Sequence, residues 1–183
     1  MRLSILMAAM ALGCAAPAAA QTAAPPVPVS TAAPADVATP EAIVGALYEV
    51  ISGDAGVARD WGRFRSLFHP TARLMPSGMN REGQGVVRSI TPDEYVTRSE
   101  PLLLAEGFHE REIARRSERF GRIVHVWSTY ESLHRLSDPQ PFARGINSIQ
   151  LFNDGVRWWV ISVYWQAETP AAPIPAEYLP PTR

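Results

Sequence analysis

Histidine and carboxylate side chains on predicted strands are the groups of this sequence best suited to exchange a proton. His125 and Glu131 alternate along the run Ile123 to Arg135, and Glu110 lies in an earlier, highly charged run. A histidine and a carboxylate can transfer a proton near neutral pH, as dehydration or isomerisation requires. We therefore take His125 with Glu131 or Glu110 as candidate catalytic residues, with Tyr130 as a hydrogen-bond donor.

A second group of polar and aromatic residues could line a ligand site. Arg144, on a neighbouring predicted strand, could pair with Glu110 or Glu112, or bind an anionic ligand. Asn147 follows small residues at positions 143 and 145, so it could hydrogen-bond to a ligand or across the core. The candidate ligand-binding residues are His69, His109, Trp127, Arg144, Asn147, Trp159 and Trp165.

Metal and cofactor chemistry has no motif in the sequence. The four histidines show no HxH or HExxH spacing. All 17 basic residues are arginines, which excludes a Schiff-base lysine and a phosphate-loop lysine. The only cysteine, Cys14, lies within residues 1–20, which resemble a cleavable secretory leader. The domain that remains after cleavage is therefore expected to have no thiolate nucleophile or cysteine-bound zinc. We predict neither a metal nor a cofactor.

Long strands must position most of these side chains. Two β-branched and aromatic runs between residues 123 and 152 are followed by Asn153-Asp154-Gly155 and a third run ending at Gln166. An Asn/Asp-Gly pair between alternating apolar runs is typical of a β-hairpin. Residues 108–118 are expected to form a charged strand in the centre of the same sheet. In the last strand, Trp159 and Trp165 belong to the more apolar face, which we expect to meet the helices.

Three helices are expected before these strands. Helix signals cover residues 39–53, 60–69 and 91–105, with Thr39, Asp60 and Thr91 as N-caps and Pro101 inside the third helix. Glu94, three residues after Thr91, completes a capping box. Short strands are predicted at 72–75 and 86–90. Helices on one side of a mainly antiparallel sheet make an α+β domain.

This order of elements resembles the nuclear transport factor 2-like superfamily, which includes ketosteroid isomerase, scytalone dehydratase and SnoaL-like polyketide cyclases. The similar segments are Leu67 to Ala72 and Asp154-Gly155 followed by residues 158–161, within about residues 39–168. The resemblance implies three N-terminal helices on the concave face of a strongly curved, cone-shaped sheet that encloses a cavity. Many relatives have Asp where this chain has Thr71, so the resemblance supplies no catalytic residue.

The two ends of the chain are expected to lie outside the domain. Residues 1–20 resemble a secretory signal peptide cleaved near Ala20-Gln21, too short to remain as a membrane helix. A weak lipobox offers the alternative of a lipid anchor at Cys14. Residues 21–38 are rich in Ala and Pro, which predicts a flexible linker. Residues 169–183 form a Pro-rich tail with Tyr178 and Leu179 as docking residues.

Several functions remain open at this point. The sequence favours an exported, periplasmic or secreted protein that binds a small hydrophobic molecule. The alternatives are a cofactor-free acid–base enzyme (a dehydratase, isomerase or cyclase) and a structural or accessory domain without a ligand. Tyr164 lies on the mixed face of the last strand, which favours a homodimer through the outer sheet face. A net charge of −1 lacks the excess of positive charge that is typical of nucleic-acid-binding proteins.

Overall fold

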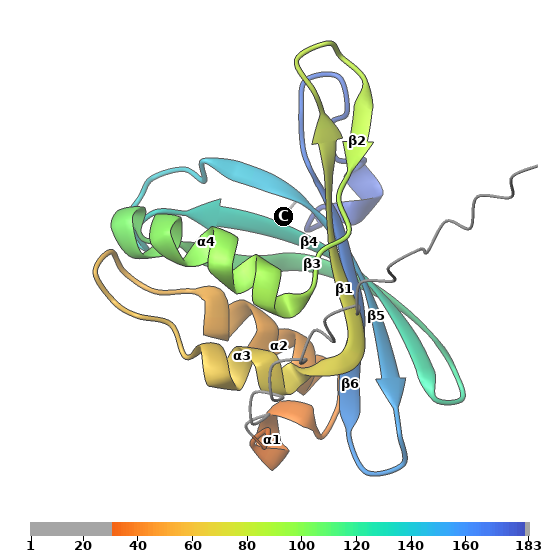
Figure 1. Ribbon diagram of the computed structural model, residues 1–183. Helices are drawn as coiled ribbons and strands as arrows, with labels where there is room; N and C mark the ends of the chain where they lie inside the picture. The colour runs from red at the N-terminus through yellow and green to blue at the C-terminus, as the bar shows by residue number, and fades with distance from the viewer. Residues whose placement is uncertain (1–30, 182–183) are drawn as a thin grey trace, which may run out of the picture.

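The computed structural model describes residues 31–181, which form one mixed sheet with the α-helices on one side (Figure 1). The predicted leader, its cleavage site and Cys14 lie outside the described residues. The helices are α1 (Pro34–Val37), α2 (Pro40–Ile51), α3 (Trp61–Leu67), α4 (Pro92–Glu106) and the short 3₁₀ helix η1 (Ala176–Tyr178). The strands are β1 (Phe68–Met79), β2 (Gly85–Val87), β3 (His109–Phe120), β4 (Ile123–Leu133), β5 (Ala143–Asn153) and β6 (Trp158–Ala167).

The sheet is open rather than a closed cone. Its six strands run in the order β2-β1-β6-β5-β4-β3, parallel between β1 and β6 and antiparallel at every other step. No strand in residues 31–181 joins β3 to β1 or β2, so both edges stay unpaired. The α+β class is confirmed, and the expectation of a strongly curved barrel is wrong. The charged strand β3 also lies at an edge, not in the centre as expected.

The three expected helices begin at their predicted caps. The side chains of Thr39, Asp60 and Thr91 each accept a hydrogen bond from a backbone N–H in the first turn. The carboxylate of Glu94 accepts in return from the Thr91 N–H, at 2.7 Å, which completes the capping box. Such local hydrogen bonds satisfy the free donors of a helix start wherever the helix finally packs.

The end of the predicted linker differs from the expectation. Residues 34–37 form α1, and Val37 is buried against α2. Asp36 accepts two hydrogen bonds from the guanidinium of Arg63 in α3, at 2.8 and 3.0 Å. This ion pair holds the pKa of Asp36 below its usual value. A bidentate contact with the folded domain therefore orders a segment whose composition alone predicts flexibility.

The core lies between the helices and one face of the sheet, and a bulge decides which residues of β6 enter it. Trp158 and Val160 are buried near the start of the strand. The register with β5 then shifts at Ile161, and Val163 is the next fully inward residue. Trp159 consequently faces away from the helices, where it contacts His69 and Arg157. The expected alternation is correct only beyond the bulge.

The C-terminal tail lies against the other face of the sheet. Thr129 of β4 donates a hydrogen bond to the carbonyl of Tyr178 at 2.6 Å, and the ring of Tyr178 packs on Trp127 with centroids 5.7 Å apart. Arg116 of β3 donates to the carbonyl of Glu177. Tyr178 is thus a docking residue, as predicted. The tail covers part of the face expected to pair two copies, and the homodimer stays a prediction.

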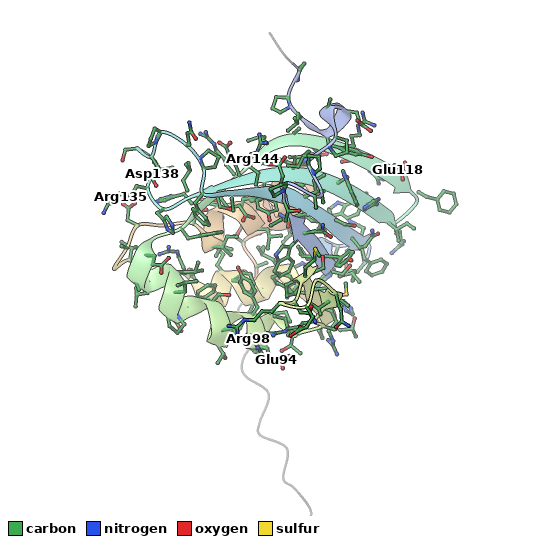
Figure 2. All side chains as sticks on the ribbon, turned by 90° about the horizontal axis from the view of Figure 1, so that it is seen from above. Glu94, Arg98, Glu118, Arg135, Asp138 and Arg144 are labelled. Carbon is green, nitrogen blue, oxygen red and sulfur yellow. The ribbon has the colours of Figure 1, made fainter. Side chains whose placement is uncertain are left out.

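Charged side chains are spread over the perimeter of the molecule (Figure 2). Glu94 and Arg98 lie along α4, and Glu118 lies near the end of β3. Asp138, in the loop after β4, accepts hydrogen bonds from the backbone N–H groups of residues 134 and 135, which closes that loop. Across residues 31–181, every helix is too short or too polar to cross a bilayer.

Candidate functional site

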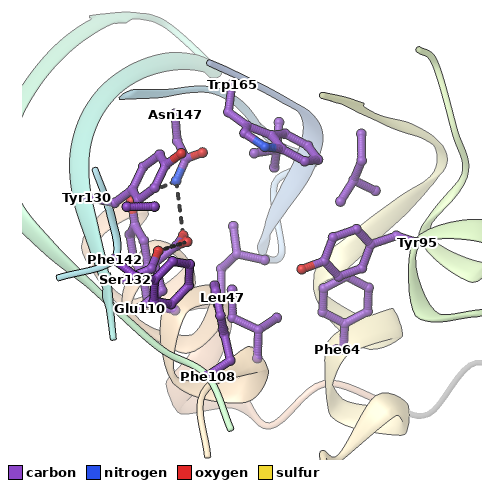
Figure 3. A pocket seen from close by; sticks show the side chains of 15 residues that line it. Leu47, Phe64, Tyr95, Phe108, Glu110, Tyr130, Ser132, Phe142, Asn147 and Trp165 are labelled. Carbon is purple, nitrogen blue, oxygen red and sulfur yellow. Dashed lines mark hydrogen bonds between the residues drawn. The ribbon is translucent and has the colours of Figure 1, made fainter. Parts of the chain in front are cut away.

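A cavity of about 220 Å³ lies between the helices and the inner face of the sheet (Figure 3). Its wall combines side chains from α2, α3, α4 and from every strand except β2. Seven of the lining side chains are aromatic, and one carries a carboxyl group. The lining residues are Leu47, Tyr48, Ile51, Phe64, Leu74, Tyr95, Phe108, Glu110, Tyr130, Ser132, Phe142, Ala143, Asn147, Val163 and Trp165.

The aromatic wall is built from helices and strands that are far apart in the sequence. Phe64 of α3 stacks on Tyr95 of α4, with centroids 5.4 Å apart. Tyr95 in turn meets the edge of Trp165 from β6 at 6.4 Å. On the opposite side of the cavity, the ring of Phe142 stacks on the imidazole of His134, which lies outside the cavity, with centroids 4.2 Å apart. Offset and edge contacts of this kind fix the orientation of aromatic rings.

Glu110 carries the one carboxyl group of the cavity wall. Ser132 donates a hydrogen bond to its Oε2 at 3.0 Å, and the Asn147 amide donates to its Oε1 at 3.4 Å. Protein atoms surround the carboxyl on nearly every side, although part of the side chain still reaches the cavity. This burial raises the pKa of Glu110 to about 7, and the two hydrogen bonds only partly oppose the rise.

A chain of hydrogen bonds leads from Glu110 away from the cavity. Asn147 also donates to the hydroxyl of Tyr48 at 3.0 Å, and that hydroxyl lies 2.6 Å from the hydroxyl of Ser128. Ser128 donates to Glu112, 2.7 Å away, and Glu112 forms an ion pair with Arg115. Because Glu112 must accept, each donor from Asn147 onward points toward Glu112, while a second N–H of Asn147 points to Glu110. The chain holds the Asn147 amide in place beside Glu110.

The tyrosine hydroxyls of the wall are neutral near physiological pH. Burial, together with the nearby Glu110 carboxyl, raises the pKa of Tyr48, Tyr95 and Tyr130 above the ordinary tyrosine value. Tyr130 fits here because Gly145 on the neighbouring strand has no side chain: a Cβ at Gly145 would lie 2.4 Å from the Tyr130 hydroxyl. The room predicted beside position 145 is therefore occupied by Tyr130.

Only part of the predicted site comes together. Glu110, Tyr130, Asn147 and Trp165 line the cavity. Within residues 31–181, no histidine lines it, so the expected pairing of His125 with Glu110 does not occur. His125 instead contacts Ser148 at 3.0 Å on the outer face of the sheet.

The other predicted residues lie elsewhere, each with a local partner. Glu131 pairs with Arg111 on the outer face, and Trp127 lies beneath the C-terminal tail. Arg144 pairs with Glu168, not with Glu110 or Glu112, so the expected ion pair is wrong. The remaining three form contacts at the surface: His109 with Asp54, His69 with Thr71, and Trp159 with Asp154.

Several lining residues were missed by sequence reasoning. Tyr48 carries a recognisable signal, since a hydroxyl on the apolar face of α2 needs a buried partner. Tyr95 and Phe64 resemble ordinary core residues of two separate helices. Phe142 lies in a loop, where no periodic pattern applies. Their meeting depends on how the helices pack on the sheet.

The donor groups of the site do not suit a metal ion. Within the described part of the chain, no three His, Cys, Asp or Glu side chains lie close enough together to bind one. Glu110 is the single carboxylate of the cavity, and its neighbours are hydroxyl, amide and aromatic groups. The lining of the cavity therefore lacks the set of ligands that a coordination site needs.

Solved structures similar to this chain share its fold at low sequence identity. A protein of unknown function with a cystatin-like fold from Nostoc punctiforme is 10% identical, with a TM-score of 0.52, over 72% of this chain and 89% of its own. A protein from Kribbella flavida is 10% identical, with a TM-score of 0.50, over 69% and 86%. A nuclear transport factor 2-like protein of unknown function from Shewanella baltica is 13% identical, with a TM-score of 0.43, over 72% and 98%.

No protein-family model and no curated protein matches the sequence. The structural likeness confirms the nuclear transport factor 2-like fold expected from the sequence, a fold called cystatin-like in the Nostoc punctiforme protein. At this level of identity it shows the fold alone, because one fold hosts many functions. The function must therefore be argued from the cavity.

Proposed function

We propose that the inner cavity binds a small, mostly apolar molecule and that Glu110 meets the polar or charged group of that molecule. The observation that carries this proposal is a buried carboxyl in a cavity whose wall is otherwise mainly aromatic and aliphatic. Few polar groups in an apolar concave site are typical of small-molecule recognition, because the apolar wall supplies affinity and the polar group fixes orientation.

The size of the cavity limits the ligand. Its volume of about 220 Å³ is below the range of about 300–1,000 Å³ found for sites of drug-sized molecules. A ligand with one or two rings fits this volume better than a larger polycyclic one. Tyr95, Phe108 and Trp165 line the cavity and remain partly exposed.

Filling the cavity is expected to abolish binding without unfolding the protein. Ala143 lines the cavity at the start of β5, so Ala143→Phe would place a ring in the ligand's space. Ile146→Phe, the control, introduces the same ring on the outer face of the same strand, away from the cavity. We expect the first variant to weaken binding at least about 10-fold and the second to leave it unchanged.

The measurement is calorimetric titration with two probes, the neutral ketone 2-tetralone and the cation benzyltrimethylammonium. Thermal unfolding of both variants checks that the fold is kept. If neither probe binds the natural protein at millimolar concentration, or if Ala143→Phe binds as well as Ile146→Phe, the proposal is wrong.

The protonation of Glu110 favours a second candidate function, proton transfer to or from the bound molecule. A pKa of about 7 leaves this carboxyl partly ionised at neutral pH, which suits a general base or acid. The base must be ionised, so the rate is expected to rise with pH up to about 7 and then level off. This chemistry uses Glu110 alone where the sequence suggested a histidine and a carboxylate.

Exchange of the α-hydrogens of 2-tetralone in deuterated water, followed by NMR, tests this second function. Glu110→Gln is expected to lower the protein-catalysed rate by about 100-fold or more. Glu118→Gln on the outer part of the same strand serves as the matched control. Equal rates for the natural protein and Glu110→Gln would leave binding as the function of the cavity.

A further inference from the structure

The cavity contains an acidic group without a basic partner. Within residues 31–181, Glu110 forms no ion pair, although eight other pairs are present. None of the lining residues is Arg or His. A buried carboxylate is stable only if it is neutralised, either by a proton or by a cation. The fold itself supplies no cation for Glu110.

The hydrogen bonds of Glu110 nevertheless suit the ionised form. Ser132 donates to one oxygen and Asn147 to the other. Asn147 is held as a donor because its amide also donates to Tyr48, whose chain of donors ends at the Glu112–Arg115 ion pair. Two donors on two oxygens favour a carboxylate over a carboxylic acid. The site is therefore prepared for a negative charge that the protein leaves uncompensated.

The rest of the cavity wall is suited to a cation that would neutralise the Glu110 carboxylate. Seven aromatic rings line the cavity, contributed by tyrosine, phenylalanine and tryptophan from helices, strands and loops (Figure 3). The face of an aromatic ring carries negative potential and attracts cations, most strongly when water is excluded. An aromatic wall with one carboxylate is a recurring solution for binding ammonium groups, and it disfavours anions.

We propose that the ligand of this cavity is a compact organic ammonium ion, with its charged nitrogen beside Glu110 and its apolar substituents against the aromatic rings. This inference rests on the proposed binding function and specifies its ligand class. The other titratable groups that face Glu110 are Tyr48 from α2, Tyr95 from α4 and Tyr130 from β4, all uncharged near neutral pH. His134 lies behind the ring of Phe142, outside the cavity.

Cation binding and protonation then compete for the same carboxylate. The burial that raises the pKa of Glu110 to about 7 makes the empty site half protonated near that pH. A cation binds only the ionised fraction, so its apparent affinity should be about 30-fold weaker at about pH 5.5 than at about pH 8.5. Binding near neutral pH should also release a proton to the buffer. A neutral ligand that accepts a hydrogen bond from the acid would show the opposite dependence.

Benzyltrimethylammonium and neopentylbenzene test the proposal, because they have the same shape and differ in the charge at one atom. Ligand-observed NMR at the two pH values gives both affinities. We expect the cation to bind at least about 10-fold more tightly than the hydrocarbon at the higher pH, and only the cation to lose affinity at the lower pH. Glu110→Gln should reduce the preference for the cation to the part that the aromatic rings provide and should remove its pH dependence, whereas Glu118→Gln should keep both.

The two proposals fail on different results. Equal affinities for cation and hydrocarbon in the natural protein would overturn the ammonium ligand class while the binding function stands. A preference for the cation that is as large in Glu110→Gln as in the natural protein would overturn the pairing of its nitrogen with Glu110. If none of the three compounds binds (benzyltrimethylammonium, neopentylbenzene or 2-tetralone), both proposals are wrong. Thermal unfolding of Glu110→Gln shows that the variant is folded, and its retained affinity for neopentylbenzene shows that the cavity is intact.

Discussion

Replacement of Arg59 by methionine is expected to lower the free energy of unfolding by about 3 kcal/mol or more. The guanidinium of Arg59 is buried, with 8% of the residue exposed. It donates hydrogen bonds to the carbonyls of Ile51 at 3.0 Å, Gly53 at 2.6 Å and Leu103 at 3.3 Å, and also to Asp54 and Val57. Methionine keeps the apolar stem and removes the guanidinium from all five carbonyls, of which those of Gly53, Asp54 and Leu103 keep a backbone N–H donor.

The position of these carbonyls explains the size of the effect. Ile51 ends α2 and Leu103 lies in the last turn of α4, so one guanidinium joins the carboxyl ends of two helices. Carbonyls at a helix end lack partners within the helix and carry partial negative charge, which a cation stabilises. Burial lowers the pKa of Arg59, as expected for a charge withdrawn from water. Lysine should not rescue the loss, because it lacks the planar fork of donors.

Urea unfolding followed by tryptophan fluorescence measures the effect of the Arg59 substitution. Arg98→Ala, on the exposed side of α4, is the control and should change the unfolding free energy by less than about 0.5 kcal/mol. Equal stabilities of the two variants would show that the hydrogen bonds of Arg59 contribute little to the fold.

Glu110→Gln is expected to change how stability depends on pH. Burial raises the pKa of Glu110 from 4.5 to about 7 in the folded protein. Below pH 4.5 the carboxyl is protonated in both states, and the protein has its full stability with respect to this group. As the pH rises toward and through 7, the unfolded chain ionises first and the folded protein loses stability. The total loss is about 3 kcal/mol.

The glutamine variant has no charge to bury, so its stability should not follow this curve. Urea unfolding at about pH 5 and about pH 9 should show the natural protein losing about 3 kcal/mol relative to Glu110→Gln. The difference between the two proteins removes the contributions of all other titrating groups. Parallel stability curves for the two proteins would mean that the pKa of Glu110 is close to that of an exposed glutamate. A saturating ammonium probe should reduce the loss at high pH, since it stabilises the ionised folded form.

Glycine 53 illustrates how a correct local assignment can miss the reason for a residue. The sequence predicts Gly53 as the residue that ends the first helix, and α2 indeed ends at Ile51. In the structure a Cβ on Gly53 would lie 2.8 Å from the guanidinium carbon of Arg59. Gly53 also forms a β-bridge with Phe108, a residue of the cavity wall. Its small size thus serves a contact between distant segments, which no local pattern reveals.

The sequence by itself determined the three main helices with their caps and the four long strands, but it missed α1 and most of the length of β1. Thr39, Asp60 and Thr91 begin helices, and the turn at Asp154-Gly155 joins two strands, because these signals act within a few residues. The order of elements was then sufficient to indicate the fold. The same alternation correctly placed His125 and Glu131 together on one strand face, but alternation alone cannot say which face is inside.

Only the tertiary structure decided which side chains meet in the cavity. A bulge between Glu112 and Ala114 reverses the alternation of β3. Even-numbered residues such as Glu110 face the cavity side before the bulge, and odd-numbered residues such as Arg115 face that side after it. A shift of one residue moves every later side chain to the opposite face of a sheet. The packing of α2 and α4 then brings Tyr48 and Tyr95 to Glu110. Such contacts depend on the position of each bulge and each helix in space. These positions are set by the packing of the whole core, not by interactions within a few residues.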